Sequence, residues 1–187
     1  MTHAEEAVVS LDGTISNLIS SGKVGRDALG VLVAIVVEES SKSSRVDELI
    51  NEIVMTRLLS PGSTRAYDFL VGLGLINLTD PTGITAKGRA VVQILVDEAA
   101  RRLNDGSEVS DAAALFLEKI ILHCTGQPVD EWIEAVLDET PRNVSKPAEI
   151  LLLEYRLAVY VADAGWSPAP LGLLVIEKIG QQTGRED

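Results

Sequence analysis

Cysteine and histidine are almost absent from this chain of 187 residues, and their scarcity excludes several kinds of chemistry. The single cysteine, Cys124, allows no intramolecular disulfide and no site that binds zinc or an iron–sulfur cluster through several thiolates. The two histidines, His3 and His123, supply little material for a metal site or a catalytic triad. Cys124 next to His123 is interpreted as a core cysteine beside a half-exposed histidine, because the sequence offers no third group for a catalytic pair.

Phosphate-binding glycine loops, His-x-x-x-His pairs and Gly-x-Ser-x-Gly motifs are also missing. These patterns hold phosphates, metal ions and nucleophilic serines, so the usual sequence signs of an enzyme are lacking. We therefore expect a non-enzymatic protein with no catalytic residue, no bound metal and no cofactor. A helical enzyme without a sequence signature is a third hypothesis, after the two developed below.

Positive charge and long apolar runs are scarce as well. Lysine and arginine number 16 against 28 acidic residues, a formal net charge of −12, which opposes indiscriminate binding to nucleic acids or anionic membranes. The longest apolar run, residues 31–37, falls well below the roughly 20 residues that span a bilayer. Glu5 and Glu6 stand where a signal peptide would carry basic residues. We expect a cytoplasmic protein that does not bind membranes.

The charge is distributed unevenly along a chain of otherwise ordinary globular composition, with 46% hydrophobic and 24% charged residues. Residues 26–95 hold seven basic and eight acidic side chains, a net charge of −1. Residues 96–187 hold eight basic and seventeen acidic ones, a net charge of −9. A surface that faces DNA is therefore expected only as a patch in the middle of the chain.

Apolar periodicity predicts helices over most of the sequence. Residues 4–20 form an amphipathic pattern, whereas residues 26–40 fit either a buried strand or a buried helix, and their length favours the helix. Further helices are expected over residues 45–57, 86–103, 110–124, 128–137, 148–164 and 170–179. The sequence pattern shows no internal repeat.

The middle of the chain has the clearest boundary signals. Ser60 and Pro61 are a typical cap and first residue of a helix, which is expected to end near Gly72 or Gly74. Two short strands are expected after it, over residues 75–78 and 84–85. Thr85 is placed to cap the helix expected over residues 86–103.

An ordered set of short motifs lies across these boundaries. It begins with Ser-Pro-Gly-Ser-Thr-Arg-Ala-Tyr at residues 60–67, continues with Gly-Leu-Ile at 74–76, and ends with Ile-Thr-Ala-Lys-Gly-Arg at 84–89. The set resembles the winged helix-turn-helix of bacterial and archaeal transcription regulators, with the MarR-like and PadR-like groups nearest. The resemblance covers residues 26–95. It implies a recognition helix at the first motif, then a two-stranded wing, then a helix.

The resemblance also implies a DNA-binding role for particular residues. A recognition helix inserts its N-terminal end into the major groove, where small residues allow close approach and backbone amides face phosphate. Arg65 would contact guanine through two hydrogen bonds, and Lys87 and Arg89 would contact backbone phosphates. The candidate DNA-binding residues are Gly62, Ser63, Thr64, Arg65, Lys87 and Arg89.

Among the departures from the family pattern, two bear on contacts with DNA. Asp68 lies three residues after Arg65 on the same helix face, where it would either pair with Arg65 or repel phosphate. The expected wing tip, residues 79–83, has no basic residue, so an arginine cannot insert into the minor groove from there.

The sequence thus predicts a mainly α-helical protein with an N-terminal helix, a winged-helix domain and an acidic C-terminal helical domain, over residues 1–25, 26–104 and 105–187. The first hypothesis is a homodimeric regulator that binds duplex DNA in a sequence-specific way. The alternative is a winged-helix adaptor that binds another protein, for example through its acidic C-terminal half, and does not bind DNA.

Overall fold

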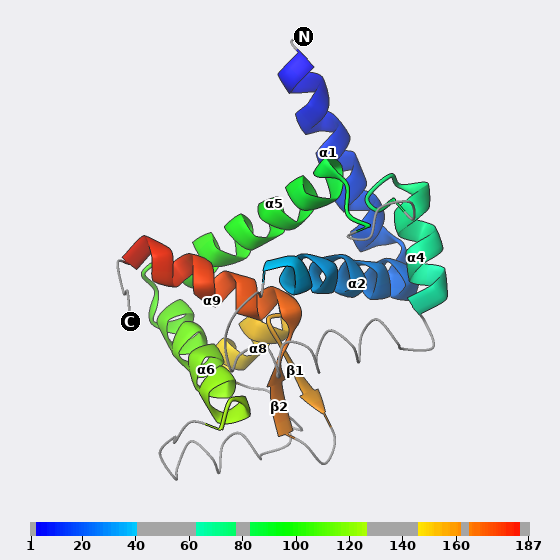
Figure 1. The fold of residues 1–187 in the computed structure, drawn as a ribbon. Helices are drawn as coiled ribbons and strands as arrows, with labels where there is room; N and C mark the ends of the chain where they lie inside the picture. Colours follow the sequence, from blue (N-terminus) through cyan, green and yellow to red (C-terminus); the bar gives the residue numbers. More distant parts are fainter. Residues whose placement is uncertain (1–2, 41–62, 78–82, 127–145, 162–164, 184–187) are drawn as a thin grey trace. The chain divides into compact units, whose positions relative to one another are not determined.

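A computed structural model shows a mainly helical chain that divides into two compact units, Met1–Leu95 and Val96–Asp187 (Figure 1). It describes residues 3–40, 63–77, 83–126, 146–161 and 165–183. These ranges hold seven α-helices and one antiparallel pair of strands. None of the helices pairs the length with the apolarity that a bilayer crossing requires. The helices expected over residues 45–57 and 128–137 lie outside the described ranges.

The first unit opens with α1 (His3–Ser20) and α2 (Gly22–Ser40), which contact each other. The sequence of α2 fitted either a strand or a helix, and the structure confirms the helix, which begins four residues earlier than expected. Leu32 is fully buried, and Val31 and Val33 are at most 2% exposed. Consecutive residues point to different sides of a helix, so the burial of all three means that α2 is covered on several sides. A helix covered in this way has no polar stripe, and its sequence resembles that of a buried strand.

The next described helix, α4 (Ser63–Gly72), contacts α2 and ends in a Schellman motif. Gly74 takes a φ of +68°, a left-handed conformation that glycine adopts without a steric penalty. The backbone N–H of Leu75 donates to the carbonyl oxygen of Leu70 at 2.9 Å, and both leucine side chains are fully buried. The chain therefore turns sharply after α4 and enters the next segment in a fixed direction.

The chain then reaches α5 (Ala86–Leu103) through a narrow antiparallel connection. Ile76 and Ile84 form an isolated bridge. The two short strands expected here are therefore reduced, among the described residues, to one bridged pair. Thr85 caps α5 as predicted, because its hydroxyl oxygen accepts the backbone N–H of Gly88 at 3.1 Å. The bounds of α5 agree with the predicted range of 86–103.

The second unit contains α6 (Glu108–Cys124), α8 (Pro147–Glu154), β1 (Ala158–Val161), β2 (Gly165–Pro168) and α9 (Pro170–Thr183). Trp166 of β2 is only 2% exposed. Its ring meets the rings of Phe116 and Tyr160 edge to face, with centroid separations of 5.5 and 6.0 Å. Such aromatic pairs contribute about 0.5–1.5 kcal/mol beyond their burial. This cluster joins the β1–β2 pair to α6.

The prediction of one continuous helix over residues 148–164 is wrong. α8 ends at Glu154, and Arg156 takes a left-handed φ of 55°. The backbone N–H of Leu157 donates to the carbonyl oxygen of Leu152 at 2.8 Å, which completes a second Schellman motif. β1 follows and pairs antiparallel with β2, whose segment was expected to be a break between helices. The valines and tyrosine of β1 are residue types that favour strands. The sequence did not predict the end of α8, because the residue at the turn is an arginine and not the glycine that usually marks a helix end.

The second unit repeats the local framework of the first. In each framework a short helix ends at a left-handed residue, two antiparallel segments pair, and a longer helix begins two residues after the pairing. Corresponding positions lie 82 residues apart before the hairpin connection and 84 residues apart after it. The pairs are Leu70 and Leu152, Gly74 and Arg156, Leu75 and Leu157, Ile76 and Ala158, Ile84 and Pro168, Thr85 and Ala169, and Gly88 and Gly172.

The contacts of the two frameworks also correspond. The carbonyl oxygen of Leu75 accepts the N–H of Thr85 at 3.0 Å, and that of Leu157 accepts the N–H of Ala169 at 2.9 Å. A Cβ added to Gly88 would lie 2.2 Å from the carbonyl oxygen of Leu75, and one added to Gly172 would lie 2.0 Å from that of Leu157. The last residue of α2 and the first of α4 are 23 positions apart, as are those of α6 and α8. The prediction of no internal repeat is therefore wrong at the level of structure.

Candidate nucleic-acid interface

The N-terminal end of α4 carries four of the candidate residues: Gly62, Ser63, Thr64 and Arg65. Gly62 lies outside the described ranges, and Ser63 and Thr64 are the first two residues of α4. Arg65 is exposed and forms no ion pair with any described residue. Ala66 and Leu70 of the same helix are fully buried. The helix therefore has one buried side and one side that presents Arg65.

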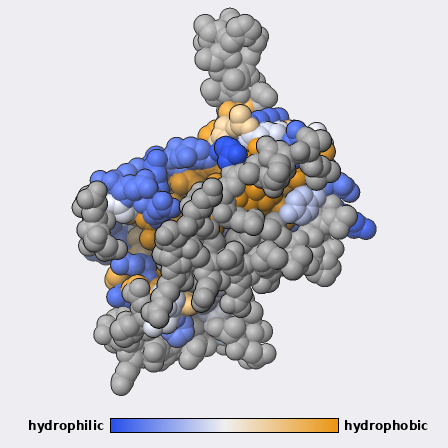
Figure 2. All heavy atoms as spheres, viewed as in Figure 1, coloured by the Kyte–Doolittle hydropathy of each residue, from blue (hydrophilic) through white to orange (hydrophobic). Residues whose placement is uncertain are grey.

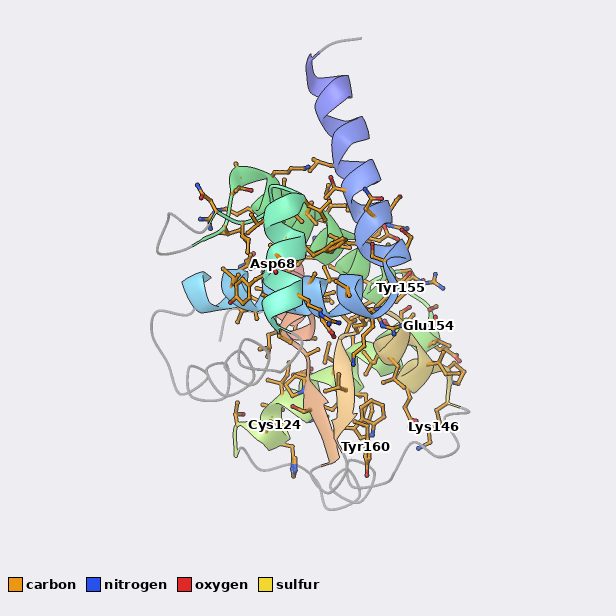
Figure 3. All side chains as sticks on the ribbon, turned by 90° about the vertical axis from the view of Figure 1, so that its right-hand side faces the viewer. Asp68, Cys124, Lys146, Glu154, Tyr155 and Tyr160 are labelled. Carbon is orange, nitrogen blue, oxygen red and sulfur yellow. The ribbon has the colours of Figure 1, made fainter. Side chains whose placement is uncertain are left out.

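The exposed side of α4 includes Arg65, Asp68 and Gly72, which we call the α4 face. Their spacing of three and four residues places them on one side of the helix. Asp68, labelled on α4 in Figure 3, forms no ion pair within the described part of the chain. Of the two roles expected for this carboxylate, pairing with Arg65 is therefore not seen. The α4 face presents a cation and an anion about one helical turn apart.

Lys87 has a partner inside its own unit. Its Nζ donates to the carbonyl oxygen of Leu73 at 3.0 Å, just beyond the last residue of α4. Carbonyl groups at the C-terminal end of a helix lack helical partners and carry partial negative charge, so an ammonium group there is stabilising. Leu73 follows Arg65 by eight residues, about 12 Å along the helix axis. Lys87 therefore binds the end of α4 opposite to the expected DNA-facing end.

Arg89 lies in the first turn of α5 and is exposed. It is two residues from Lys87, and residues at this spacing do not share a helix face. The expected site residues are therefore not all alike: Arg65 and Arg89 are exposed, whereas the ammonium of Lys87 contacts a helix end. Arg65 remains a candidate for contact with an external anion, and Arg89, which is exposed, also interacts within the chain.

Two positioning residues near the site did not emerge from sequence reasoning about function. The Thr85 hydroxyl, besides capping α5, donates to the carbonyl oxygen of Gly74 at 2.8 Å. Gly88 lets the first turn of α5 approach the Leu75 carbonyl more closely than any side chain would allow. The only sequence signal for this packing is the cap residue followed three positions later by glycine. Both residues fix the chain that leaves α4 against the start of α5.

Metal ligands and reactive groups do not gather in the described ranges, where no cluster of three or more histidine, cysteine, aspartate or glutamate side chains can hold a metal ion. Cys124 is half-buried and its thiol donates to the carbonyl oxygen of Trp166 at 3.7 Å, while His123 is exposed.

Comparisons with protein-family models, curated proteins and solved structures find no match to this chain.

Proposed function

We propose that the first unit binds duplex DNA as a winged-helix regulator, with the N-terminal end of α4 in the major groove. The observation that carries this proposal is Arg65, an exposed guanidinium without an ion-pair partner among the described residues, on a helix whose other side is buried. A guanidinium can donate two parallel hydrogen bonds to the N7 and O6 atoms of guanine, which discriminates against other bases by about 1–3 kcal/mol.

The packing around α4 supports this orientation. Lys87 binds the carbonyl end of α4, and the Thr85 hydroxyl bonds to the carbonyl of Gly74 just after it. Both contacts secure the C-terminal end of the helix and leave its N-terminal end to approach a ligand. Arg89 would add a contact to backbone phosphate, which positions a protein on DNA without reading sequence.

The proposed regulator acts as a homodimer. One arginine–guanine contact of about 1–3 kcal/mol is far short of the roughly 11 kcal/mol that a Kd of about 10 nM requires. Two copies of α4 on half-sites about 34 Å apart would double the specific contacts. Ile19 of α1 is 66% exposed, and a contact between copies through α1 would bury it.

Fluorescence anisotropy with a labelled duplex of mixed sequence tests the proposal at about 50 mM and about 200 mM salt. The affinity should fall with salt, and Arg65→Ala should weaken binding about tenfold, which corresponds to about 1.4 kcal/mol. Arg101→Ala is the matched control, because Arg101 is an exposed arginine of the second unit that pairs with Glu98 at 2.7 Å. Absence of binding at about 50 mM salt, or equal losses in both variants, would overturn the proposal.

A protein-binding adaptor is the second candidate function, and the charge of the chain favours it. Residues 96–187 carry a net charge of −9, and Asp68 adds a carboxylate to the α4 face itself. A duplex would be repelled by both, whereas a basic protein surface would be attracted. Failure of the anisotropy test together with salt-sensitive binding to a basic protein segment would establish the adaptor function.

A further inference from the structure

The repeated framework identifies a second exposed helix face that corresponds to the α4 face. Pro147, Ile150 and Glu154 of α8 occupy the positions of Arg65, Asp68 and Gly72 in α4. All six residues are exposed, and the buried Leu152 corresponds to the buried Leu70. We call Pro147, Ile150 and Glu154 the α8 face. It is the surface that the second unit presents where the first unit presents its candidate DNA-binding residues.

The chemistry of the α8 face differs from that of the α4 face. Proline replaces the arginine, and Ile150 leaves 38% of its surface exposed. Glu154, at the end of α8 in Figure 3, forms no ion pair within the described ranges. Lys146, the nearest cation at the start of the helix, pairs with Glu149 at 3.4 Å. The α8 face thus combines apolar surface with a carboxylate that has no ion-pair partner among the described residues, and none of its three residues is a cation that could bind a phosphate.

Among the described residues of the second unit, carboxylates outnumber cations. Arg101, Arg102 and Lys178 form ion pairs with Glu98, Asp105 and Asp97 at 2.7, 3.0 and 3.2 Å, so their charges are already matched. Figure 2 shows hydrophilic residues along the visible side of α5, which carries both arginines. Other exposed carboxylates, including Glu108 and Asp111, have no ion pair among the described residues. This excess of negative charge favours positively charged partners over nucleic acids.

We infer that the α8 face binds a basic amphipathic segment of another protein. An apolar side chain of the partner would pack on Pro147 and Ile150, and a lysine or arginine would pair with Glu154. Partial exposure of an isoleucine beside a carboxylate matches an apolar anchor with a charged rim, the usual composition of a protein interface. The two frameworks of the chain would then have different partners, duplex DNA for the first and a basic protein segment for the second.

Titration of the full-length protein with a designed probe peptide tests this inference. The probe is a helical peptide with leucines on one side and lysines on the other, and the comparison peptide replaces every lysine with glutamate. Calorimetry should give measurable affinity for the lysine peptide and none for the glutamate peptide. Amide chemical shifts of the ¹⁵N-labelled protein should change along α8 when the lysine peptide is added.

Matched variants separate this site from general charge attraction. Ile150→Asp and Glu154→Lys should each weaken binding of the lysine peptide about tenfold, a loss of about 1.4 kcal/mol. Leu115→Asp and Glu108→Lys make the same changes at exposed positions of α6, and Leu115 is 53% exposed. These two controls should weaken binding less than threefold, and circular dichroism checks that all four variants keep their helices.

Three results would overturn the inference. Equal weakening by Glu154→Lys and Glu108→Lys would show attraction by net charge alone. Shift changes confined to elements other than α8 would place the peptide elsewhere. Shift changes along α8 on addition of a duplex oligonucleotide, without any from the lysine peptide, would assign this face to nucleic acid. None of these results depends on whether Arg65 contacts DNA, so the proposed function of the first unit is tested separately.

Discussion

Lys87 shows how the partner of a single charge decides its role. Its ammonium contacts the Leu73 carbonyl oxygen, so Lys87→Gln removes a charge-assisted bond and should lower the free energy of unfolding by about 1 kcal/mol. Arg65→Gln, an exposed change on α4 at a residue that forms no ion pair with any described residue, should alter it by less than about 0.5 kcal/mol. Urea denaturation of both variants measures the difference.

DNA titrations of Arg89→Gln and Lys87→Gln should differ if the first unit binds a duplex. Each phosphate contact contributes about 0.9 to the slope of log affinity against log salt, so Arg89→Gln should reduce that slope while Lys87→Gln leaves it unchanged. A reduced slope together with unchanged stability in Lys87→Gln would instead make Lys87 a phosphate contact, as the sequence resemblance implied.

Sequence reasoning at this scale predicted caps better than long-range partners. The role of Thr85 as a helix cap was predictable because the cap bond joins residues three positions apart. The contact of Lys87 spans fourteen positions and depends on the turn after α4, which no local pattern encodes. A lysine after a turn has the same sequence signature whether it contacts solvent, phosphate or a helix end.

At the scale of elements, one glycine in each framework sets how closely a helix approaches the preceding turn. Gly88→Ala would place a Cβ 2.2 Å from the Leu75 oxygen, and Gly172→Ala would place one 2.0 Å from the Leu157 oxygen. Both helices must shift, so each change should destabilise the protein by about 1–3 kcal/mol. Gly180→Ala in α9 meets nothing within 4 Å and should stabilise by up to about 1 kcal/mol. The melting temperatures of the three variants test this packing, and equal values for all three would contradict it.

The connection between α5 and α6 contains a carboxylate whose ionisation is coupled to folding. Hydroxyl groups of Ser107 and Ser110, then the backbone N–H of Ser107, lower the pKa of Asp105 from 3.8 to about 2. A carboxylate with a lowered pKa stabilises the folded state above its unfolded pKa, and this contribution is lost as the pH falls from about 4 to about 2. Asp105→Asn should therefore flatten the loss of stability over this range.

Urea unfolding between pH 5 and pH 2 compares Asp105→Asn with the parent chain, and carbon-detected NMR follows the carboxyl titration directly. The control is Asp111→Asn, which replaces another exposed aspartate near the start of α6. A carboxyl titration of Asp105 close to 4 would show that the serine contacts do not hold its charged form.

The helices themselves were largely predictable, and the strands of the second unit were not. α5 agrees with its predicted range because its cap at Thr85 and its stop at residues 104–106 are both local signals. β1 was missed because the left-handed turn before it is made by Arg156, a residue type with no turn preference. Leu157 then continues an apolar run that periodicity alone cannot divide between a buried helix and a buried strand.

The whole molecule consists of two units with one framework and different charges. The repeat was invisible in the sequence because few corresponding residues are identical, and those that are, such as Leu75 with Leu157, serve the backbone geometry. The residues of the two frameworks differ most on the exposed helix faces, where packing imposes no residue type. Shared geometry with different surface charge would allow the chain to bind both of the proposed partners, a duplex and a basic protein segment.

Net charge at this scale should limit any affinity for DNA. Glu154 ends α8 and Glu177 lies in the middle of α9, and both carboxylates are exposed, so neutralising them should change the free energy of unfolding by less than about 0.5 kcal/mol. The double variant Glu154→Gln, Glu177→Gln should bind a mixed duplex about two- to fivefold more tightly at about 50 mM salt. The gain should largely vanish near 200 mM salt, because repulsion between exposed charges is screened beyond roughly 10 Å. An equal gain at both salt concentrations would mean that these carboxylates lie against the duplex, which would place the second unit in the DNA interface.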